Sequence, residues 1–423
     1  MLDIKLIRNN PEDVKKRLAA RNFKTAVVDE ILDLDKNKRE YQQKLEDIRS
    51  QKNQFNKNIQ KFSAQEKKEK LGEMARLVKE ESKIEDEMKE TTETFNKLIL
   101  ELPNLPLPDV KKGKDETNNE VVKTVGQPTK LDFKTKNHLE LGEQLDLIDT
   151  KTAAKVAGSR FAYLKNEAVL LEFALINYAF DVLTKEKFQP VVPPVMIKEE
   201  MMAGLGYLGD QGEAEIYHFT KDKLYFVGTA EHSLIPMQAD EILLEKNLPL
   251  RYAGFSTAFR REAGSYGKDT RGILRVHQFD KVEMVSFTKP EVSDKEHEYL
   301  LSLSEKLIQA LNLPYRIVKM CTGDLAYPSA RTYDIECWIP SENKFRETHS
   351  ISSCTDYQAR RLKIRYKSKN GKNELVHTLN GTAFAIGRTL IAILENYQQK
   401  DGSVKIPEVL QKYCGFKEIR NEK

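Results

Sequence analysis

The residues best suited to phosphate chemistry lie between two strand-like segments, from residue 259 to residue 283. The first segment ends in Phe-Arg-Arg-Glu at residues 259–262. In the second segment, residues 276–283, apolar side chains recur among polar ones. The loop between them contains three glycines and further basic residues, including Lys268 and Arg271. A guanidinium on a rigid strand can bind one phosphate through two hydrogen bonds, while a mobile basic loop closes over the others. The pattern predicts a polyphosphate clamp, and a charged surface hairpin is the alternative.

A second set of side chains could bind an ammonium group. Thr229, Ala230 and Glu231 follow an apolar, strand-like segment, so that a hydroxyl and a carboxylate stand close together at its end. The same residues could instead open a helix from Glu231 to Leu243, with Thr229 as its N-terminal cap. Both interpretations stay open from the residues alone.

Two further sets of residues could bind the phosphates and a metal counter-ion. Residues 347–350, Glu-Thr-His-Ser, place a carboxylate and a hydroxyl three residues apart on a predicted strand, and such oxygen ligands suit magnesium. Residues 380–382, Asn-Gly-Thr, precede a predicted helix that carries Arg388. Each set also has an ordinary interpretation, because a lone acid on a strand is commonly solvated and an arginine in a helix commonly forms a salt bridge.

These side chains need a sheet to position them, and the periodicity of the sequence supplies its strands. Alternating or apolar runs predict strands at residues 224–227, 250–259, 275–287, 315–320, 332–339 and 345–352. Helical patterns cover residues 167–183, 291–311 and 388–397. Strands in succession with helices outside them predict an α+β fold on an antiparallel sheet. Neither a Walker A sequence nor a Gly-x-Gly-x-x-Gly after a strand occurs, so side chains must bind the phosphates.

The first hundred residues follow a different period. From Ile31 to Phe62 and again from Met74 to Leu102, mainly apolar residues recur at alternating spacings of three and four, with a polar break at residues 63–66. Two such helices joined by a short break predict an antiparallel coiled-coil hairpin. Prolines stop the second helix, and residues 103–130 are predicted to form an irregular linker. We therefore expect one domain over residues 1–110 and another over residues 111–423.

Charge is divided between the two arms of the predicted hairpin. Residues 36–70 hold eleven lysines or arginines against five acids, a balance of +6, whereas residues 71–102 hold five against nine, a balance of −4. A basic helix can bind a nucleic-acid backbone, but it could equally be a solvated surface that binds a partner protein. The arm lacks an aromatic platform for stacking bases, which favours contact with backbone shape over base readout.

Length and composition restrict the class of protein. With 423 residues, the chain is longer than one typical core, which fits two domains. No apolar run approaches the ~18 residues of a transmembrane helix, and the first residues lack the apolar stretch of a secretion signal. The four cysteines have no zinc-ligand spacing, so we expect no zinc, no disulfide framework and free thiols in a reducing cytoplasm.

Taken together, these patterns resemble the class II aminoacyl-tRNA synthetases and, within them, the bacterial type of seryl-tRNA synthetase. Residues 259–283 resemble motif 2 of that class, the prolines near residue 193 resemble motif 1, and residues 380–398 resemble motif 3. Residues 145–164, LDLIDTKTAAKVAGSRFAYL, are also typical of the family. The resemblance spans nearly the whole chain. It implies ATP-dependent activation of L-serine and its transfer to tRNA(Ser), and also to tRNA(Sec) where that tRNA is present.

The resemblance also implies ligands and partners. It implies a homodimer formed through the motif 1 region, a coiled coil that binds the long variable arm of tRNA(Ser), and magnesium bound with ATP. The residues implied for ATP are Arg260, Arg261, Glu262, Arg271, Phe279, Glu347, Thr348, His349, Ser350 and Arg388. Those implied for serine are Thr229, Ala230, Glu231, Glu283 and Thr382, and those implied for magnesium are Glu347 and Ser350.

Individual roles follow from position in the family's motifs. Arg260 is implied to hold the α-phosphate, and Arg388 the γ-phosphate side together with Arg271; Arg260 and Arg388 are the residues implied for catalysis. Glu262 is implied to bind the adenine amino group, with Phe279 stacked on the ring. The reaction requires positioning and charge neutralisation more than proton transfer, and arginines with magnesium suit it.

The sequence departs from the family's usual pattern at three places. Residues 348–351 are Thr-His-Ser-Ile where Ile-Ser-Ser-Cys is usual, and the ordinary spacing from Glu347 to Asp356 selects Ser350 as the magnesium ligand. Thr382 stands where serine is commoner, which leaves open whether serine is contacted there through a side chain or the backbone. Lys187 stands where motif 1 often has glycine.

Three other interpretations can be compared with this one. An enzyme that loads an activated amino acid onto a carrier protein would lack the coiled-coil arm, which this chain has. A catalytically inactive paralogue would have lost Arg260, Glu262, Glu347 or Arg388, and all four are present. A coiled-coil scaffold with an unrelated α+β domain would leave the pattern of residues 259–283 unexplained.

Overall fold

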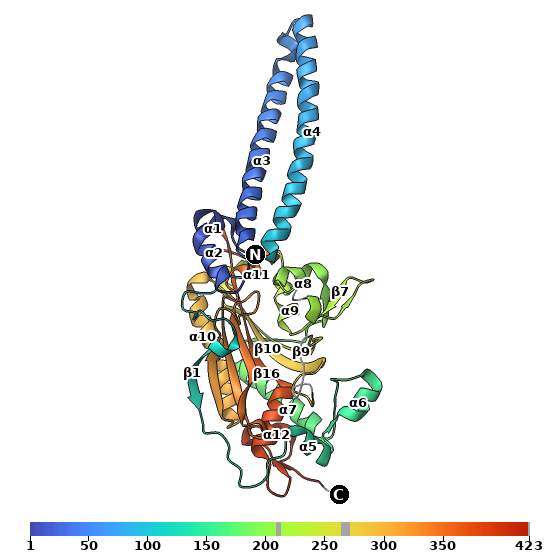
Figure 1. Ribbon diagram of the computed structural model, residues 1–423, viewed down its shortest axis with the longest axis vertical. Coiled ribbons are helices and arrows are strands. Elements are labelled where there is room, and N and C mark those ends of the chain that lie inside the picture. The colour runs from blue at the N-terminus through green and yellow to red at the C-terminus, as the bar shows by residue number, and fades with distance from the viewer. Residues whose placement is uncertain (209–212, 264–270, 422–423) are drawn as a thin grey trace. The chain divides into compact units, whose positions relative to one another are not determined.

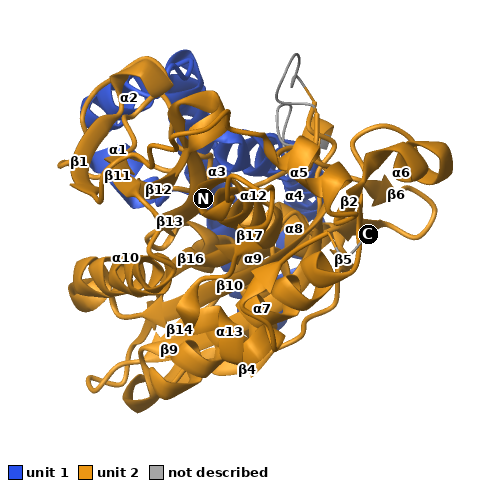
Figure 2. Cartoon of the chain, turned by 90° about the horizontal axis from the view of Figure 1, so that it is seen from below, with its two compact units in different colours: residues 1–103 blue, residues 104–423 orange. Residues whose placement is uncertain are grey.

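The chain forms two compact units, residues 1–103 and residues 104–423 (Figure 2). The computed structural model describes residues 1–208, 213–263 and 271–421. The division between the units falls shortly before residue 110, where the sequence predicts the domain boundary. Within the described residues, no helix is both long enough and apolar enough to cross a lipid bilayer.

The first unit is a helical hairpin with two short helices before it (Figure 1). The short helices are α1 (Ile4–Asn9) and α2 (Pro11–Ala19), and the arms are α3 (Ala26–Asn58) and α4 (Ala64–Glu101). The second arm begins at the predicted polar break, because the hydroxyl of Ser63 accepts from the backbone N–H of Glu66 while the Glu66 carboxylate accepts from that of Ser63. This capping starts α4 earlier than the apolar repeat alone predicts, and α3 also begins earlier, at Ala26.

The seam of the hairpin contains the residues that the heptad spacing selects. Leu45, Ile48 and Ile84 are buried together at its centre. A polar position of each repeat meets a partner across the seam, since Lys52 Nζ lies 2.5 Å from Glu81 Oε2. The predicted hairpin is thus confirmed, and its charged seam residues are paired instead of being exposed.

The second unit is built on an eight-stranded sheet. Its strands, in spatial order, are β1 (Glu120–Val125), β11 (Tyr315–Lys319), β12 (Arg331–Ile339), β13 (Lys344–Ser353), β16 (His377–Ala385), β10 (Gln278–Thr288), β9 (Leu250–Phe259) and β4 (Gln189–Val191). All neighbours are antiparallel except β4 and β9. The predicted antiparallel α+β fold is confirmed. The predicted linker is wrong at one point, because residues 120–125 pair with β11 at the edge of the sheet.

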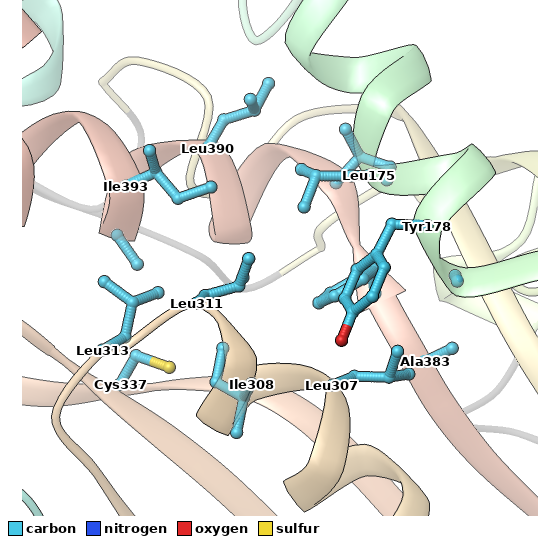
Figure 3. Packing of buried hydrophobic residues seen from close by; sticks show 14 of the residues in the cluster. Leu175, Tyr178, Leu307, Ile308, Leu311, Leu313, Cys337, Ala383, Leu390 and Ile393 are labelled. Atoms are coloured by element: carbon cyan, nitrogen blue, oxygen red, sulfur yellow. The ribbon is translucent and has the colours of Figure 1, made fainter. Parts of the chain in front are cut away.

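Helices α7 (Glu167–Lys185), α10 (Ser293–Ala310) and α12 (Ile386–Tyr397) bury their apolar faces in the largest hydrophobic core (Figure 3). Leu175 and Tyr178 of α7 lie there with Leu307 of α10 and Leu390 of α12. This packing holds the sheet from behind, so that side chains on its other face can line a cavity without losing their positions.

Shorter elements surround the sheet. They are α5 (His138–Gln144), β2 (Ile148–Asp149), α6 (Thr150–Ala157), β3 (Tyr163–Leu164), β5 (Met196–Lys198), α8 (Glu199–Leu205), β6 (His218–Phe219), β7 (Leu224–Phe226), α9 (Glu231–Leu234), β8 (Ile242–Leu244), α11 (Tyr357–Leu362), β14 (Arg365–Lys367), β15 (Asn373–Leu375), β17 (Val404–Lys405), α13 (Glu408–Cys414) and β18 (Glu418–Ile419). The predicted helix from Glu231 to Leu243 is wrong, because it ends at Leu234, just before Pro236.

Candidate active site

A cavity of about 370 Å³ opens on the face of the sheet where four neighbouring strands meet. Residue 260 directly follows β9, and further contributions come from β10, β13, β16, the start of α12 and residues 228–232 around the start of α9. The predicted site residues in its wall are Thr229, Glu231, Arg260, Glu262, Phe279, Glu347, Thr348, Ser350, Thr382 and Arg388. Residues far apart in the sequence are thus brought to one site by the antiparallel order of the strands.

Arg260 and Phe279 form one end of the cavity. The Arg260 guanidinium lies 5.3 Å from the centre of the Phe279 ring, and its Nε donates to the carbonyl of Gly228 at 3.1 Å. The backbone of Arg260 is fixed as well, because its N–H donates to the carbonyl of His277 at 3.0 Å. A cation held over an aromatic face beside an open cavity can meet a phosphate and a flat ring together.

Glu262 lies two residues beyond, in a left-handed backbone conformation with φ of 49°. Arg160 Nη1 donates to the carbonyl of Glu262 at 2.8 Å, which holds this uncommon conformation in place. The Glu262 carboxylate accepts from Arg275 Nη1 at 3.3 Å. Glu262 lines the cavity, and a carboxylate there can accept a hydrogen bond from an amino group.

Glu347 and Arg388 form a second charged pair in the wall. Arg388 Nη1 lies 3.1 Å from Glu347 Oε2 and donates to the Glu347 carbonyl at 3.0 Å. Loss of water around Glu347 would raise its pKa, but Arg388, Arg260 and Lys281 together lower that pKa instead. Glu347 is therefore ionised at neutral pH, and its side chain remains 45% exposed and accessible from the cavity.

Ser350 lies on the same strand as Glu347, opposite Asp334 of β12. The buried Asp334 carboxyl accepts a hydrogen bond from the Ser350 side chain. Burial, and then the charge of Glu347, raise the pKa of Asp334 well above its ordinary value. Its Oδ1 has no hydrogen-bond partner among the described residues. The oxygens of Glu347 and Ser350, backed by Asp334, fit the donor set that magnesium prefers.

These oxygens do not form a complete metal cage. Within residues 1–208, 213–263 and 271–421, no group of three or more His, Cys, Asp or Glu is arranged to hold a metal ion by itself. Magnesium in nucleotide sites is commonly bound by one or two carboxylates, with the substrate's phosphates and water completing its shell. The arrangement fits an ion that arrives with a polyphosphate.

A buried polar cluster also borders the cavity. Thr229 Oγ1 donates to Glu283 Oε2 at 2.9 Å, and Lys281 Nζ donates to Thr229 Oγ1 at 3.2 Å and forms an ion pair with the Glu283 carboxylate. The hydroxyl of Thr229 caps no helix, since α9 starts after Ala230 without a side-chain cap. The capping interpretation of Thr229 is therefore wrong.

Glu231 lies beside this cluster and is held by neutral donors. Gln358 Nε2 donates to Glu231 Oε1 at 2.9 Å, and the Tyr207 hydroxyl lies 3.4 Å from the same oxygen. Burial raises the pKa of Glu231 to about 7, and the charge of Glu283 adds to this effect. A carboxyl with such a pKa can gain or lose its proton near neutrality when a cation enters or leaves the cavity.

The remaining predicted residues lie outside the cavity wall. Arg261 is exposed, with its guanidinium 5.5 Å from the Tyr217 ring. His349 is fully buried, and its Nδ1 lies 2.8 Å from Thr348 Oγ1. Ala230 is buried behind the wall, and Arg271 is exposed where the described chain resumes. Lys268 lies outside the described residues.

Glu283 does not line the cavity but is reached from it through Thr229 and Lys281. It stands opposite Thr382 in the register of β10 and β16, so both residues belong to the same end of the site.

Three wall or support residues were missed from the sequence. Lys281 could have been found, because it stands between Phe279 and Glu283 at the two-residue period of a strand. Gln358 and Tyr207 gave no such signal, since a lone glutamine and a lone tyrosine far from the motifs have no pattern to select them. His232 is also in the wall; burial lowers its pKa to about 3, and its Nδ1 accepts from the Gly228 N–H at 3.1 Å.

Comparisons with known proteins agree with this geometry. The family model described as tRNA synthetase class II core domain (G, H, P, S and T) matches residues 217–397, which include the strands that carry the site. The fold and the site therefore define a class II tRNA synthetase core. A second model, described as Seryl-tRNA synthetase N-terminal domain, matches residues 1–106. Together with the full-length similarity given below, these matches show that the chain belongs to the seryl-tRNA synthetase family.

The similarity covers the whole chain. A serine--tRNA ligase from Dictyoglomus turgidum is 46% identical over 100% of both chains. The crystal structure of seryl-tRNA synthetase from Pyrococcus horikoshii, complexed with ATP, has a TM-score of 0.95 and 43% identity, again covering 100% of both. The structure of a cytoplasmic enzyme of Naegleria fowleri with AMP has a TM-score of 0.90 at 33% identity, covering 100% of this chain and 99% of the other.

Proposed function

We propose that this chain activates L-serine with ATP and transfers the seryl group to the 3′ end of tRNA(Ser), and of tRNA(Sec) where a cell has one. The observation that carries the proposal is the union, in one cavity, of two arginine sites with the polar cluster around Thr229. The arginine sites can bind a polyphosphate, and the cluster around Thr229 can bind the ammonium group of an amino acid. Family membership over the whole chain supports the same reaction.

The chemistry follows from the charges in the wall. A carboxylate oxygen of serine bonds to the α-phosphorus of ATP, and the bond from that phosphorus to the β-bridging oxygen breaks, so that pyrophosphate leaves with the electron pair. Negative charge builds up on the α-phosphate, where Arg260 lies within reach, while Arg388 and Arg271 hold the γ-phosphate side. Fixed cations stabilise this charge without having to reorganise during the step. A proton-transfer residue is not required for adenylate formation.

Adenine and magnesium are assigned to neighbouring parts of the wall. Phe279 stacks on the adenine ring, and Glu262 accepts from its amino group. Glu347 and Ser350 would hold magnesium, which would supply charge neutralisation to the phosphates when it is bound. Asp334 supports Ser350 from behind through the hydrogen bond it accepts. Arg261, Thr348 and His349 border these groups in sequence and remain predicted contacts of the nucleotide.

Serine is selected by buried polar groups. Thr229 and Glu283 bind its ammonium group, with Glu231 beside them, and Thr382 faces its hydroxyl from β16 opposite Glu283. Ala230 holds the turn between Thr229 and Glu231. An analogue without the hydroxyl leaves buried donors and acceptors unpaired, and such sites commonly reject it by a large factor. Alanine should therefore be a very poor substrate.

The hairpin of α3 and α4 is proposed to bind tRNA(Ser). Its basic arm and tip carry exposed lysines, among them Lys57, Lys61 and Lys68, and phosphate contacts would dominate the affinity there. A flat, mostly charged helical surface suits the shape of a long RNA arm more than its base edges.

A homodimer is proposed through the region of α7 and β4. Phe173 and Leu170 of α7 are 55% and 50% exposed, and Val192 after β4 is 78% exposed. Motif 1 of the family includes this segment. Exposed apolar side chains that gather in one region favour burial against a second copy of the chain. At the end of α7, Lys187 has a φ of 66°, which explains why glycine is common there in the family.

The four cysteines are free thiols, and three of them, Cys321, Cys337 and Cys354, are buried. Free thiols persist in reducing compartments, which supports the cytoplasm as the place of function.

The proposal is tested by charging assays with purified protein, ATP and radiolabelled serine. We expect seryl-tRNA(Ser) to form and an acyl-carrier or peptidyl-carrier protein to stay unlabelled. Labelling of a carrier protein without labelling of tRNA(Ser) would instead support an amino-acid-activating enzyme of the carrier-loading type. Labelling of neither, in a preparation that binds ATP, would support an inactive paralogue.

A further inference from the structure

Lys281 occupies a position that the proposed reaction reserves for its substrate. Its ammonium group forms an ion pair with Glu283 and donates to Thr229 Oγ1 at 3.2 Å. Lys281 is 9% exposed and Glu283 is 1% exposed, so that water contributes little to this contact. Lys281 also lines the main cavity, which means that its side chain can be approached by whatever enters.

The two groups that hold this ammonium are those proposed to hold the ammonium of serine. An α-ammonium and a lysine ammonium carry the same charge and the same three N–H donors, so each satisfies Glu283 and Thr229 equally well. The Thr229 hydroxyl also donates to the Glu283 carboxylate at 2.9 Å, so the two groups form one polar site, and the Lys281 ammonium contacts both of them. Serine and Lys281 therefore compete for one position.

We propose that Lys281 is an internal counter-ion of the serine pocket, which the ammonium group of the substrate displaces when serine binds. The inference rests on the proposed function of Thr229 and Glu283. In the free enzyme the lysine keeps the buried carboxylate paired, because an unpaired buried charge is strongly destabilising. When serine arrives, it takes over this pairing, and the lysine is released without leaving Glu283 uncompensated.

The released lysine stays within the cavity that contains the proposed phosphate site. Lys281 lies on the face of β10 that also carries Phe279, and its charge already acts on Glu347. Its flexible stem lets the ammonium swing while the strand stays fixed. Movement toward Glu347 brings a positive charge to the part of the cavity where the phosphates are proposed to bind. Occupation of the amino-acid pocket thus adds a cation to the phosphate site.

The exchange also makes Lys281 a specificity-determining residue. A substrate can displace the lysine at little cost only if it supplies an ammonium group of its own. Glycerate, which has the serine skeleton with a hydroxyl in place of the amine, would have to leave the Lys281–Glu283 pair intact or leave Glu283 unpaired. Both routes weaken its binding, so the lysine discriminates against compounds without an amine.

The test is the dissociation constant of L-serine, measured by equilibrium dialysis without ATP, for wild type, Lys281→Met and Lys281→Arg. The measurement is made at pH 8, because a buried carboxylate that loses its partner tends to take up a proton at lower pH. Methionine keeps the length of the side chain and removes the competitor, so we expect Lys281→Met to bind serine about tenfold tighter than wild type. L-Glycerate should gain nothing, and the ratio of the two affinities should rise by about the same factor.

Lys281→Arg keeps a cation in the pocket and supports the test if the methionine variant folds poorly. A guanidinium pairs with a carboxylate through two hydrogen bonds and is harder to displace, so serine should bind more weakly than to wild type. A thermal melt supplies a readout besides affinity, because serine should raise the melting temperature of Lys281→Met more than that of wild type at the same concentration.

Each outcome decides the proposal. Weaker or unchanged serine binding by Lys281→Met, with a melting transition like that of wild type, would overturn it, as would unchanged binding by Lys281→Arg. A failure of the proposed function looks different, because the wild-type protein itself would then bind no serine.

Discussion

Single residues in this site depend on each other for their charge. Glu347 lines the cavity and stays ionised because Arg388 lies 3.1 Å away, and Arg388 also donates to the Glu347 carbonyl. Glu231, in contrast, has only neutral donors in contact, and burial raises its pKa to about 7. Two carboxyl groups that line one cavity thus have pKa values shifted in opposite directions.

Replacing Arg388 with alanine should reduce the rate of adenylate formation about 100-fold or more and raise KM for ATP, because a cation at the proposed phosphate site is lost and Glu347 is left unpaired. Arg388→Lys should recover part of the rate. Serine-dependent pyrophosphate exchange measures both constants. Arg365→Ala is the matched control, since Arg365 pairs with Asp240 at 2.9 Å outside the cavity. An Arg388→Ala enzyme as fast as the control would contradict the assignment.

Glu231→Gln should change how stability depends on pH. Because the folded-state pKa of Glu231 is raised from 4.5 to about 7, the protonated carboxyl favours the folded state fully below pH 4.5, and this advantage disappears as pH rises through about 7. Relative to the glutamine variant, wild type should lose about 3 kcal/mol between pH 4.5 and pH 7. Denaturant unfolding of both proteins across this range measures the difference. A constant difference would show that Glu231 is ionised in the folded state throughout.

At the scale of elements, the sequence predicted where the strands lie but not which strands pair with each other. The strands predicted at residues 250–259 and 332–339 coincide closely with β9 and β12, and both are largely buried in the sheet. The placement of β16 between β13 and β10 had no local signal, yet it brings Thr382 opposite Glu283. Strand order depends on long-range packing, so the local pattern of the sequence does not show which site residues lie opposite each other.

Two predicted elements, the helix from Glu231 and the linker at residues 120–125, differ from the structure. The helix predicted from Glu231 is wrong because Pro236 lacks the backbone N–H that a helix interior requires, and α9 ends at Leu234. Residues 120–125 form β1 although five of the six are exposed, because backbone pairing with β11 at an edge requires no apolar pattern. An edge strand of this kind leaves no pattern of buried apolar residues in the sequence.

The two arms of the hairpin offer a direct test of its charge. Reversing Lys57, Lys61 and Lys68 to glutamate should weaken tRNA(Ser) binding at least about tenfold and reduce its salt dependence, because phosphate contacts are lost. The same reversal of Lys79, Lys83 and Lys89, also exposed but on the acidic arm, is the matched control and should have a much smaller effect. Filter binding over a salt series measures both.

Serine-dependent pyrophosphate exchange should be unchanged in both hairpin variants, and also in a protein lacking residues 36–95, which should fail to charge tRNA. Normal charging by the shortened protein would remove the hairpin from tRNA recognition.

At the scale of the whole molecule, the active site and the apolar region around α7 belong to one unit of the chain. Helix α7 has one face in the large core with Leu175 and Tyr178, while Phe173 and Leu170 remain exposed. A helix that is apolar on more than one side is expected to be covered on both. The second cover is, in our proposal, the same helix region of another copy.

Phe173→Glu should therefore convert the protein from a dimer to a monomer, because a carboxylate would be buried without a partner in a two-fold interface. Sedimentation at micromolar concentration distinguishes the two states. Val121→Glu replaces an equally exposed apolar residue on the edge strand and should leave the dimer intact. A wild-type protein that sediments as a monomer would refute the interface.

The central claim, that one cavity joins ATP chemistry to the recognition of serine, is tested most directly by ATP–pyrophosphate exchange with each of the twenty amino acids. We predict exchange with serine and only marginal exchange with alanine and threonine, because the buried cluster around Thr229 and Glu283 and the facing Thr382 require both an ammonium group and a correctly placed hydroxyl. Exchange with alanine or threonine at the rate seen with serine would contradict this account of the pocket.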